Sequence, residues 1–353
     1  MKIDKMTLHG LIARKLSRAG LKKDDAIIMA DVLLFAESRG IASHGAVRVE
    51  YYAERIFKGG MSRDPDSVFE KTGPCSAILH GDNGPGMVLA KQAMEHAITM
   101  AQQQGIAVVG VKRMSHSGAI SYYTHMAAEA GLIGLAMCQS DPMVVPFGGA
   151  DIYYGTNPIA FSAPAREKIL TFDMATSVQA WGKILDMRAR NKPIPDTWAV
   201  DARGKPTTDP HQVRGLLPIA GAKGYGLMMM VDLLSGVLLG LPFGRSVSSM
   251  YADLSKGRDL GQLNIVINPA FFGDRAQFLD NVQQVMEELT QLTPAENAGR
   301  VMYPGEIADL EQQRTDREGI DIVEAIYAYL MSDAVWINSC DGKDPFAENR
   351  PMT

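Results

Sequence analysis

The sequence predicts an α/β fold behind a helical N-terminal segment, and two observations lead to this prediction. Between residues 68 and 269, short and uniformly apolar runs alternate with helical stretches. Such runs are typical of strands that are buried on both faces of a sheet. The first sixty residues instead repeat apolar side chains at helical spacing. With 353 residues the chain can bury a large core, and its length suggests two or three subdomains.

Three helices are expected in the N-terminal segment. The first spans residues 8–16 and stops at Gly20, because glycine commonly ends a helix. The second runs over about 24–37. The third is expected over about 43–57, with the hydroxyl of Ser43 as its N-cap.

The alternating part of the chain gives the remaining elements in order. The expected strands cover residues 76–81, 105–111, 132–138, a stretch within 168–177, and 263–269. The expected helices cover residues 87–104, 118–130, 224–240 and 274–292, with one further helix after residue 177. Asp274 and Gln277 have the spacing of a capping box, which marks the start of the last of these helices.

We expect four parts along the chain. Residues 1–72 form the helical segment with substrate-binding residues, and residues 73–118 together with 246–303 form an α/β subdomain. Residues 119–245 form a cofactor-binding subdomain, and residues 304–353 form a C-terminal segment.

Composition excludes several classes of function. The net charge of -5 leaves no basic surplus to neutralise phosphates, which argues against a nucleic-acid partner. Cys75, Cys138 and Cys340 are odd in number and far apart, so they predict neither a disulfide framework nor a metal site. The seven histidines lack the His-Glu-x-x-His spacing of zinc enzymes. The N-terminus lacks a signal-peptide pattern, so a cytoplasmic protein is expected.

Residues 224–243 form a segment long and apolar enough to be considered as a membrane span. Asp232 would lie near its middle, at a cost of about 2.5 to 3.5 kcal/mol for insertion. A helix buried in the α/β core explains the same residues, and we therefore predict a buried helix.

Polar residues follow the expected strands at the ends where ligands bind in open α/β sheets. The strand 105–111 leads to His116, the strand 132–138 leads to Asp141, and the strand around residue 170 leads to Asp173. If the first two strands are neighbours, Asp141 could orient the imidazole of His116 for general acid/base work. Taken alone, His116 within Ser-His-Ser-Gly and Asp141 before Pro142 are also typical of turns.

Arg48 and Lys223 each have two interpretations. Arg48 is either a clamp for a carboxylate or an arginine stacked on Tyr51 or Tyr52, which follow at helical spacing. Lys223 either neutralises an anion at a helix N-terminus or is simply solvated. No Gly-x-Gly-x-x-Gly or Walker motif follows any expected strand, so a standard Rossmann site is excluded.

Five longer blocks of sequence carry a specific resemblance. They cover residues 43–56, 114–123, 139–161, 172–177 and 221–232, and the strand around 263–269 extends them. Together they resemble the malate/L-lactate dehydrogenase family, whose NAD(P)-binding fold is not a Rossmann fold. The resemblance implies an oxidoreductase of 2-hydroxy or 2-keto acids. Its closest branch belongs to allantoin breakdown and implies oxidation of (S)-ureidoglycolate to oxalurate with NAD.

The resemblance also implies roles for individual residues. His116 would be the acid/base with Asp141 as its orienting partner, while Ser43, His44 and Arg48 would hold the substrate carboxylate. The residues implied to line the cofactor are Ser140, Asp173, Met174, Ala175, Lys223, Gly305 and Glu306. A homodimer with its sites near the subunit contact is expected.

Other activities remain open on the sequence. Malate, lactate, sulfolactate or diketogulonate are possible substrates within the family, and residue types do not decide between NAD and NADP. A Ser-His hydrolase is a rival, although no Gly-x-Ser-x-Gly elbow is present. A metabolite-binding or membrane protein is a third alternative, which rests on residues 224–243 alone.

Overall fold

The computed structural model describes residues 1–347. Its α-helices are α1 (Lys5–Arg18), α2 (Lys23–Ser38), α3 (Val49–Lys58), α4 (Gly86–Gln104), α5 (Ser121–Glu129), α6 (Trp181–Ala189), α7 (Ala222–Ser235), α8 (Arg275–Gln291), α9 (Glu306–Glu318) and α10 (Glu324–Met331). Its strands are β1 (Lys2–Ile3), β2 (Val68–Lys71), β3 (Ser76–Gly84), β4 (Ile106–Met114), β5 (Ile133–Cys138), β6 (Ile159–Pro164), β7 (Ile169–Met174), β8 (Ala199–Val200), β9 (Gly215–Leu216), β10 (Leu260–Ile267) and β11 (Ile320–Asp321). The 3-10 turns used below are η1 (Ala42–His44), η2 (Ala46–Arg48) and η4 (Val237–Leu239).

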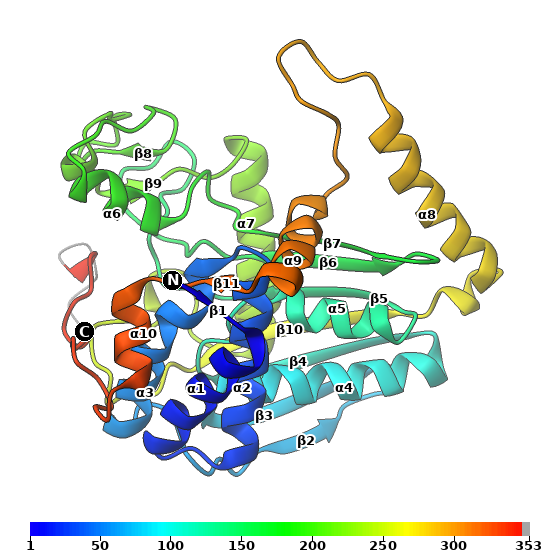
Figure 1. The fold of residues 1–353 in the computed structure, drawn as a ribbon, viewed down its shortest axis with the longest axis horizontal. Coiled ribbons are helices and arrows are strands. Elements are labelled where there is room, and N and C mark those ends of the chain that lie inside the picture. Colours follow the sequence, from blue (N-terminus) through cyan, green and yellow to red (C-terminus); the bar gives the residue numbers. More distant parts are fainter. Residues whose placement is uncertain (348–353) are drawn as a thin grey trace.

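A seven-stranded sheet runs through the middle of the molecule in the order β2-β3-β4-β10-β5-β6-β7 (Figure 1). Only β3 and β4 pair in parallel, and every other neighbouring pair is antiparallel. The late strand β10 lies between β4 and β5. The two strands that lead to His116 and Asp141 are therefore not neighbours, which corrects the condition on which their direct pairing was expected. Apolar periodicity identifies a strand, but it carries no information about the order of strands in a sheet.

Helices cover both faces of this sheet. Val109 of β4 belongs to the same apolar core as Ala93 and Ala97 of α4. Val108 points to the opposite face, because side chains alternate along a strand, and it packs in a cluster with Val231 of α7. The helix α5 packs against β5, β6 and β7. Burial on both faces explains why the strands read as continuous apolar runs.

The chain between α2 and α3 differs from the expected single helix. It forms the turns η1 and η2, and Ser43 is not a helix N-cap, because its hydroxyl bonds to the Nδ1 atom of His44 at 3.0 Å. The carboxylate of Glu37 accepts a hydrogen bond from the amide of Ala46 at 2.6 Å. A Cβ added at Gly45 would lie 1.8 Å from an oxygen of Glu37. This close approach bends the chain back and delays the start of α3 to Val49.

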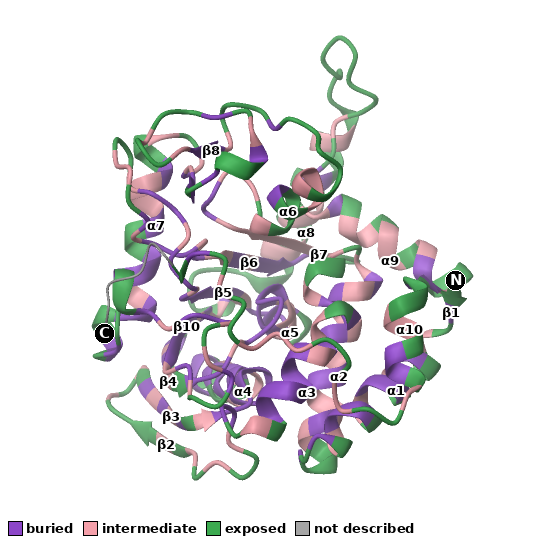
Figure 2. Cartoon of the chain, turned by 90° about the vertical axis from the view of Figure 1, so that its left-hand side faces the viewer, coloured by how far each residue is buried: buried purple, intermediate pink, exposed green. Residues whose placement is uncertain are grey.

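The expectation of a buried helix at residues 224–240 is only half right. One side of α7 is buried, including Val231 and Asp232, whereas Met229 and Leu233 are exposed (Figure 2). The carboxylate of Asp232 accepts a hydrogen bond from the amide of Gly244 at 3.1 Å. This bond gives the carboxylate a partner on the buried side of α7. Residues 222–239 have the length and hydropathy of a membrane span, but one such helix is weak grounds for a membrane protein.

Candidate active site

The expected site residues gather at one edge of the sheet. Register pairs Met114 of β4 with Leu260 of β10, and Cys138 of β5 with Gln262 of β10. In the same way, Ile159 at the start of β6 pairs with Met137 and with Met174. The loops that leave β4, β5 and β7, and those that enter β10 and β6, therefore emerge side by side.

His116 lies in the loop between β4 and α5. Its Nδ1 atom lies 2.7 Å from the hydroxyl of Tyr52 and accepts a hydrogen bond from the amide of Gly118 at 3.2 Å. A Cβ added at Gly86 would lie 2.0 Å from the carbonyl oxygen of Ser115, so the start of α4 holds this loop closely from behind. The imidazole is half-buried, and within residues 1–347 its Nε2 atom has no hydrogen-bond partner. The ring is thus fixed at Nδ1 and available at Nε2.

The surroundings of His116 keep it neutral. Burial lowers the pKa of His116 well below its usual range, and the neighbouring His44, Arg48 and Arg258 lower it further. The rings of His44 and His116 stack with centroids 5.7 Å apart. Burial, followed by the charge of Arg48, lowers the pKa of His44 to about 4. Both imidazoles are therefore free bases near neutral pH.

Arg48 is held by three groups, one of them the Sδ atom of Met250 at 3.9 Å from Nη1, and its guanidinium keeps the Nη2 atom available. Its Nε atom donates to the carbonyl oxygen of Ser43 at 2.7 Å, and its Nη1 atom donates to the hydroxyl of Tyr251. Within the described residues, no partner of the Nη2 atom is found. A carboxylate can thus bind the guanidinium at its Nη2 atom.

Asp141 reaches the same site through an arginine. One of its carboxylate oxygens accepts a hydrogen bond from the Nη2 atom of Arg258 at 3.0 Å, and the other accepts from the amide of Met250 at 2.7 Å. The groups bonded to the Nδ1 atom of His116 are the hydroxyl of Tyr52 and the amide of Gly118. Arg258 lies two residues before β10, the strand between β4 and β5; it pairs with Asp141, and its charge also acts on His116.

A chain of hydrogen bonds connects the expected cofactor residues. The hydroxyl of Ser140 bonds to the hydroxyl of Thr156 at 3.0 Å. The carbonyl oxygen of Thr156 accepts from the amide and the hydroxyl of Thr176, directly after Met174 and Ala175. The carbonyl oxygen of Thr176 accepts from the amide of Ile219, just before α7. The end of β5, the end of β7 and the beginning of α7 therefore form one continuous surface.

Lys223 lies at the beginning of this helix. It is exposed in the first turn of α7, and no side chain caps that helix N-terminus. Uncapped amides together with an ammonium group form a site suited to phosphate groups.

Gly305 and Glu306 approach the same strand from the C-terminal part of the chain. A Cβ added at Gly305 would lie 1.8 Å from the carbonyl oxygen of Thr171 in β7. Gly305 also has a φ of 92°, which favours glycine. One carboxylate oxygen of Glu306 accepts from Arg300 at 2.7 Å, and the other is buried with no partner within residues 1–347. Such an oxygen is suited to accept a hydrogen bond from a ligand hydroxyl or amide.

Asp173, an expected cofactor residue on β7, makes a structural connection. Its carboxylate accepts hydrogen bonds from the amide of Ser121 at 3.0 Å and from its hydroxyl at 2.8 Å. Burial raises the pKa of Asp173, while these two bonds act in the opposite direction. The bonds join β7 to the first residue of α5, directly after the loop of His116.

The structure adds three residues to the site that the sequence did not single out for chemistry. Tyr52 bonds His116, Tyr251 bonds Arg48, and Arg258 bonds Asp141. Tyr52 follows Arg48 by four residues, one helical turn, and this spacing was the only signal for it. Nothing in the local sequence distinguishes Tyr251 as a partner of Arg48, 203 residues away, or Arg258 as a partner of Asp141, 117 residues away.

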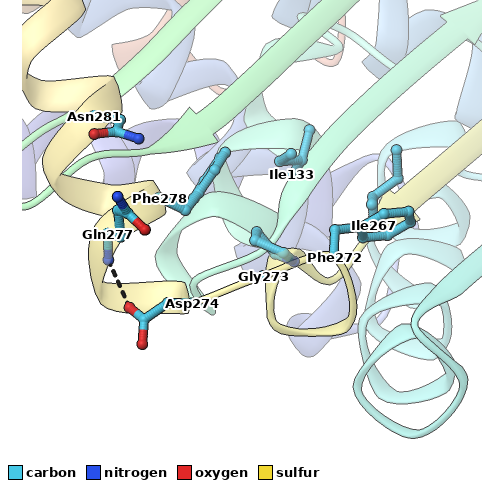
Figure 3. Close-up of a pocket in the computed structure, with 9 residues that line it drawn as sticks. Ile133, Ile267, Phe272, Gly273, Asp274, Gln277, Phe278 and Asn281 are labelled. Atoms are coloured by element: carbon cyan, nitrogen blue, oxygen red, sulfur yellow. Dashed lines mark hydrogen bonds between the residues drawn. The ribbon is translucent and has the colours of Figure 1, made fainter.

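A separate pocket of about 470 Å³ lies beneath α8 (Figure 3). It is at the opposite end of β5 and β10 from the candidate active site. Ile133, Ile267 and Phe278 give it an apolar lining. Its one carboxylate, Asp274, accepts a hydrogen bond from the amide of Gln277 and caps α8, as expected from the sequence. The pocket therefore holds no group suited to acid/base chemistry.

Comparison with known proteins extends over almost the whole chain. The family model described as malate/L-lactate dehydrogenase matches residues 3–331. The ureidoglycolate dehydrogenases (NAD(+)) of Escherichia coli O157:H7 and of strain K12 are each 63% identical over 349 residues, which is 99% of this chain and 100% of theirs. The structure of sulfolactate dehydrogenase from Methanocaldococcus jannaschii matches with a TM-score of 0.88 at 34% identity, covering 94% of this chain and 95% of that chain. The structure of malate dehydrogenase from Pyrococcus horikoshii OT3 matches with a TM-score of 0.84 at 32% identity, covering 93% of each chain.

Proposed function

The chain belongs to the malate/L-lactate dehydrogenase family, and on this premise we propose that it is an NAD-dependent dehydrogenase that oxidises (S)-ureidoglycolate to oxalurate. The observation that carries the proposal is the 63% identity, over 99% of the chain, to ureidoglycolate dehydrogenase (NAD(+)) from Escherichia coli. The reaction would belong to the breakdown of allantoin.

The residues that would hold NAD suit a dinucleotide in chemistry. The uncapped N-terminus of α7 and the ammonium group of Lys223 favour an anion such as its pyrophosphate. The buried free oxygen of Glu306 is an acceptor for a hydroxyl or amide of the cofactor. Ser140, Asp173, Met174, Ala175 and Gly305 would complete the wall. NAD supplies the acceptor for the hydride that leaves the hydroxyl-bearing carbon.

Around the substrate, each group of the chain has a separate task. The Nη2 atom of Arg48 would bind the carboxylate beside the reacting carbon, and Ser43 and His44 would complete this subsite. The Nε2 atom of His116 would take the proton of the substrate hydroxyl as the C–H bond breaks. A lowered pKa leaves His116 neutral at neutral pH, which is the charge state that a proton acceptor requires. Asp141 would act by fixing Arg258 and the backbone at Met250.

A panel of substrates tests the proposal. The purified chain is mixed with NAD or NADP and with (S)-ureidoglycolate, malate, lactate or sulfolactate, and the absorbance of the reduced nicotinamide is followed. We expect the highest kcat/KM with (S)-ureidoglycolate and NAD. Faster turnover of malate or sulfolactate would assign the chain to another activity of the family, and no reduction of either cofactor would contradict a dehydrogenase.

We also propose that the chain acts as a homodimer in the cytoplasm. The face of α7 and η4 that points to solvent presents a continuous apolar stripe, which is formed by Met229, Met230, Leu233, Val237 and Leu238. Exposed stripes of this kind are typical of subunit interfaces. The stripe lies on the same helix as Lys223, which agrees with an expected site close to the subunit contact.

Sedimentation of the purified chain tests the dimer. Leu238→Asp is expected to give monomers, since it places a charge in the stripe, while Met6→Asp, at an exposed position of α1, should leave the dimer intact. A wild-type chain that sediments as a monomer would overturn the proposal. Recovery of the active chain from the membrane fraction of cells would contradict the cytoplasmic location.

A further inference from the structure

The bonds of His116 determine where its proton lies. The amide of Gly118 can only donate, so the Nδ1 atom that it approaches at 3.2 Å carries a lone pair. The single proton of the neutral ring is then on Nε2. The hydroxyl of Tyr52, 2.7 Å from the same Nδ1 atom, therefore donates its hydrogen bond in this state.

This resting tautomer cannot act as the base in alcohol oxidation. To take a proton at Nε2, the ring must first carry its own proton on Nδ1. The amide of Gly118 cannot accept a hydrogen bond from that Nδ1–H group, because an N–H group only donates. A phenol can both donate and accept. Tyr52 is fully buried, and burial raises its pKa, so its hydroxyl stays protonated and neutral over the working pH range.

We propose that Tyr52 is a positioning residue for the reaction, whose hydroxyl reverses its hydrogen bond to the Nδ1 atom of His116 during each turnover. It donates in the resting enzyme and accepts when Nδ1 is protonated. Between these two states the ring takes up one solvent proton on Nδ1 and gives its Nε2 proton to solvent, with no net change of charge. As the hydride leaves the substrate for NAD, the O–H bond breaks, its proton moves to Nε2, and the ketone forms. The imidazolium then releases its Nδ1 proton to solvent, which restores the resting tautomer. This inference rests on the proposed dehydrogenase function.

The other groups around the ring do not accept a hydrogen bond from its Nδ1 atom, so this role falls to Tyr52. His44 on η1, Arg48 on η2 and Arg258 before β10 are neutral or positive, so none of them stabilises an imidazolium. The carboxylate of Asp141 is bonded to Arg258, and the hydroxyl of Tyr251 to Arg48. A carboxylate at the position of Tyr52 would hold Nδ1–H permanently and raise the pKa of His116. A phenol supports the charged ring only while it forms.

Tyr52→Phe tests the proposal, because it removes the hydroxyl and keeps the ring. We expect kcat with (S)-ureidoglycolate to fall about 10- to 100-fold, as for a lost hydrogen bond to a charged group. The acidic limb of the kcat/KM profile should move to lower pH, since the imidazolium loses an acceptor whereas the neutral ring keeps Gly118. The Kd for NAD should stay unchanged. Tyr122→Phe, next to the site loop and packed on Phe35, is the matched control and should behave like wild type.

Two results would overturn the inference, and both are separate from failure of the proposed function. The first is a wild type that oxidises ureidoglycolate together with a folded Tyr52→Phe variant that has the same kcat and the same acidic limb. The second needs no variant: nitrogen NMR of histidine-labelled wild type should show the neutral His116 ring protonated at Nε2, and a ring protonated at Nδ1 would contradict the resting state. A wild type with no activity on any substrate would refute the dehydrogenase itself.

Discussion

Two imidazoles lie face to face in the candidate active site, and both are uncharged near neutral pH. His116 is buried near Arg48 and Arg258. The carboxylate of Asp141, the expected orienting partner of His116, is bonded to Arg258 instead. A histidine in these surroundings gives up an acquired proton easily. Such a base suits alcohol oxidation, in which the proton must leave before the next turnover.

Removal of the imidazole of His116 should stop chemistry without loosening the cofactor. His116→Ala is expected to lower kcat about 100-fold or more, the usual cost of losing a positioned acid/base. The Kd for NAD, measured by calorimetry, should change little, because none of the proposed cofactor residues is bonded to the ring. His80→Ala, on β3 and bonded to Glu70, is the control and should keep full activity. A His116→Ala variant with near-normal turnover would mean that the histidine is structural.

The guanidinium of Arg48 should be irreplaceable by an ammonium group. Its Nε and Nη1 atoms are already bonded to Ser43 and Tyr251, and one lysine Nζ atom cannot keep those bonds and also grip a carboxylate in a plane. Arg48→Lys is expected to lower kcat/KM by an amount that corresponds to about 1 to 3 kcal/mol. Steady-state kinetics of the variant measure this loss. An unchanged kcat/KM would show that the carboxylate binds elsewhere.

At the scale of helices and strands, the sequence predicted the regular elements well and their arrangement poorly. The helices α1, α2, α4 and α8 and the strands β3, β5 and β10 lie close to their expected positions. The strands β2 and β6 were not predicted. The strand β6 follows a stretch rich in glycine and proline, and β2 is short, mostly exposed and lies at the sheet edge, so neither has a strong apolar pattern.

The site was predictable to the extent that its residues follow strands. His116, Asp141, Ser140 and Met174 were selected as candidates because they stand at strand ends, and the register brings those ends together. The partners of these residues were not predictable. Tyr52 lies on a helix that precedes the sheet, and its contact with His116 depends on tertiary packing, which no local pattern encodes.

The N-cap of α8 provides a test at the scale of one element. Asp274→Ala removes the oxygen that accepts from the amide of Gln277 at 2.8 Å, and it should lower the free energy of unfolding by about 1 kcal/mol. Urea denaturation measures the loss. Gln284→Ala, exposed on the same helix, serves as the control and should have little effect. Because α8 lies away from the active edge, kcat should remain unchanged in both variants; a loss of kcat would connect α8 to the site.

At the scale of the whole molecule, buried histidines should make stability depend on pH. Burial, with Arg48 and Arg39 as further causes, lowers the pKa of His44 and of His125 to about 4. In the unfolded chain each histidine has a pKa of about 6.5. As the pH falls from about 6.5 toward 4, the unfolded state therefore binds more protons than the folded state, and the free energy of unfolding decreases.

Unfolding of a variant isolates this contribution. His125 is a residue of α5 that bonds to Arg39, outside the active site, so His125→Gln should make the urea midpoint fall less steeply between about pH 7 and pH 5 than in wild type. The buried carboxylates are the same in both chains, so their contribution cancels in the comparison. Equal slopes for the two chains would mean that His125 is charged in the folded state.

The position of β10 also determines when the protein can fold during its synthesis. Residues 260–267 form the strand between β4 and β5, so a growing chain that has completed residues 1–250 holds two sheet halves with no partner between them. Pairings that are this distant in sequence form slowly, and they leave strand edges open in the meantime. A chain that ends at residue 250 should therefore lack cooperative unfolding by circular dichroism. The ribosome must extend the chain past residue 267 before the site can exist, and until then the unpaired edges of β4 and β5 are the parts of the nascent chain that most need protection from aggregation.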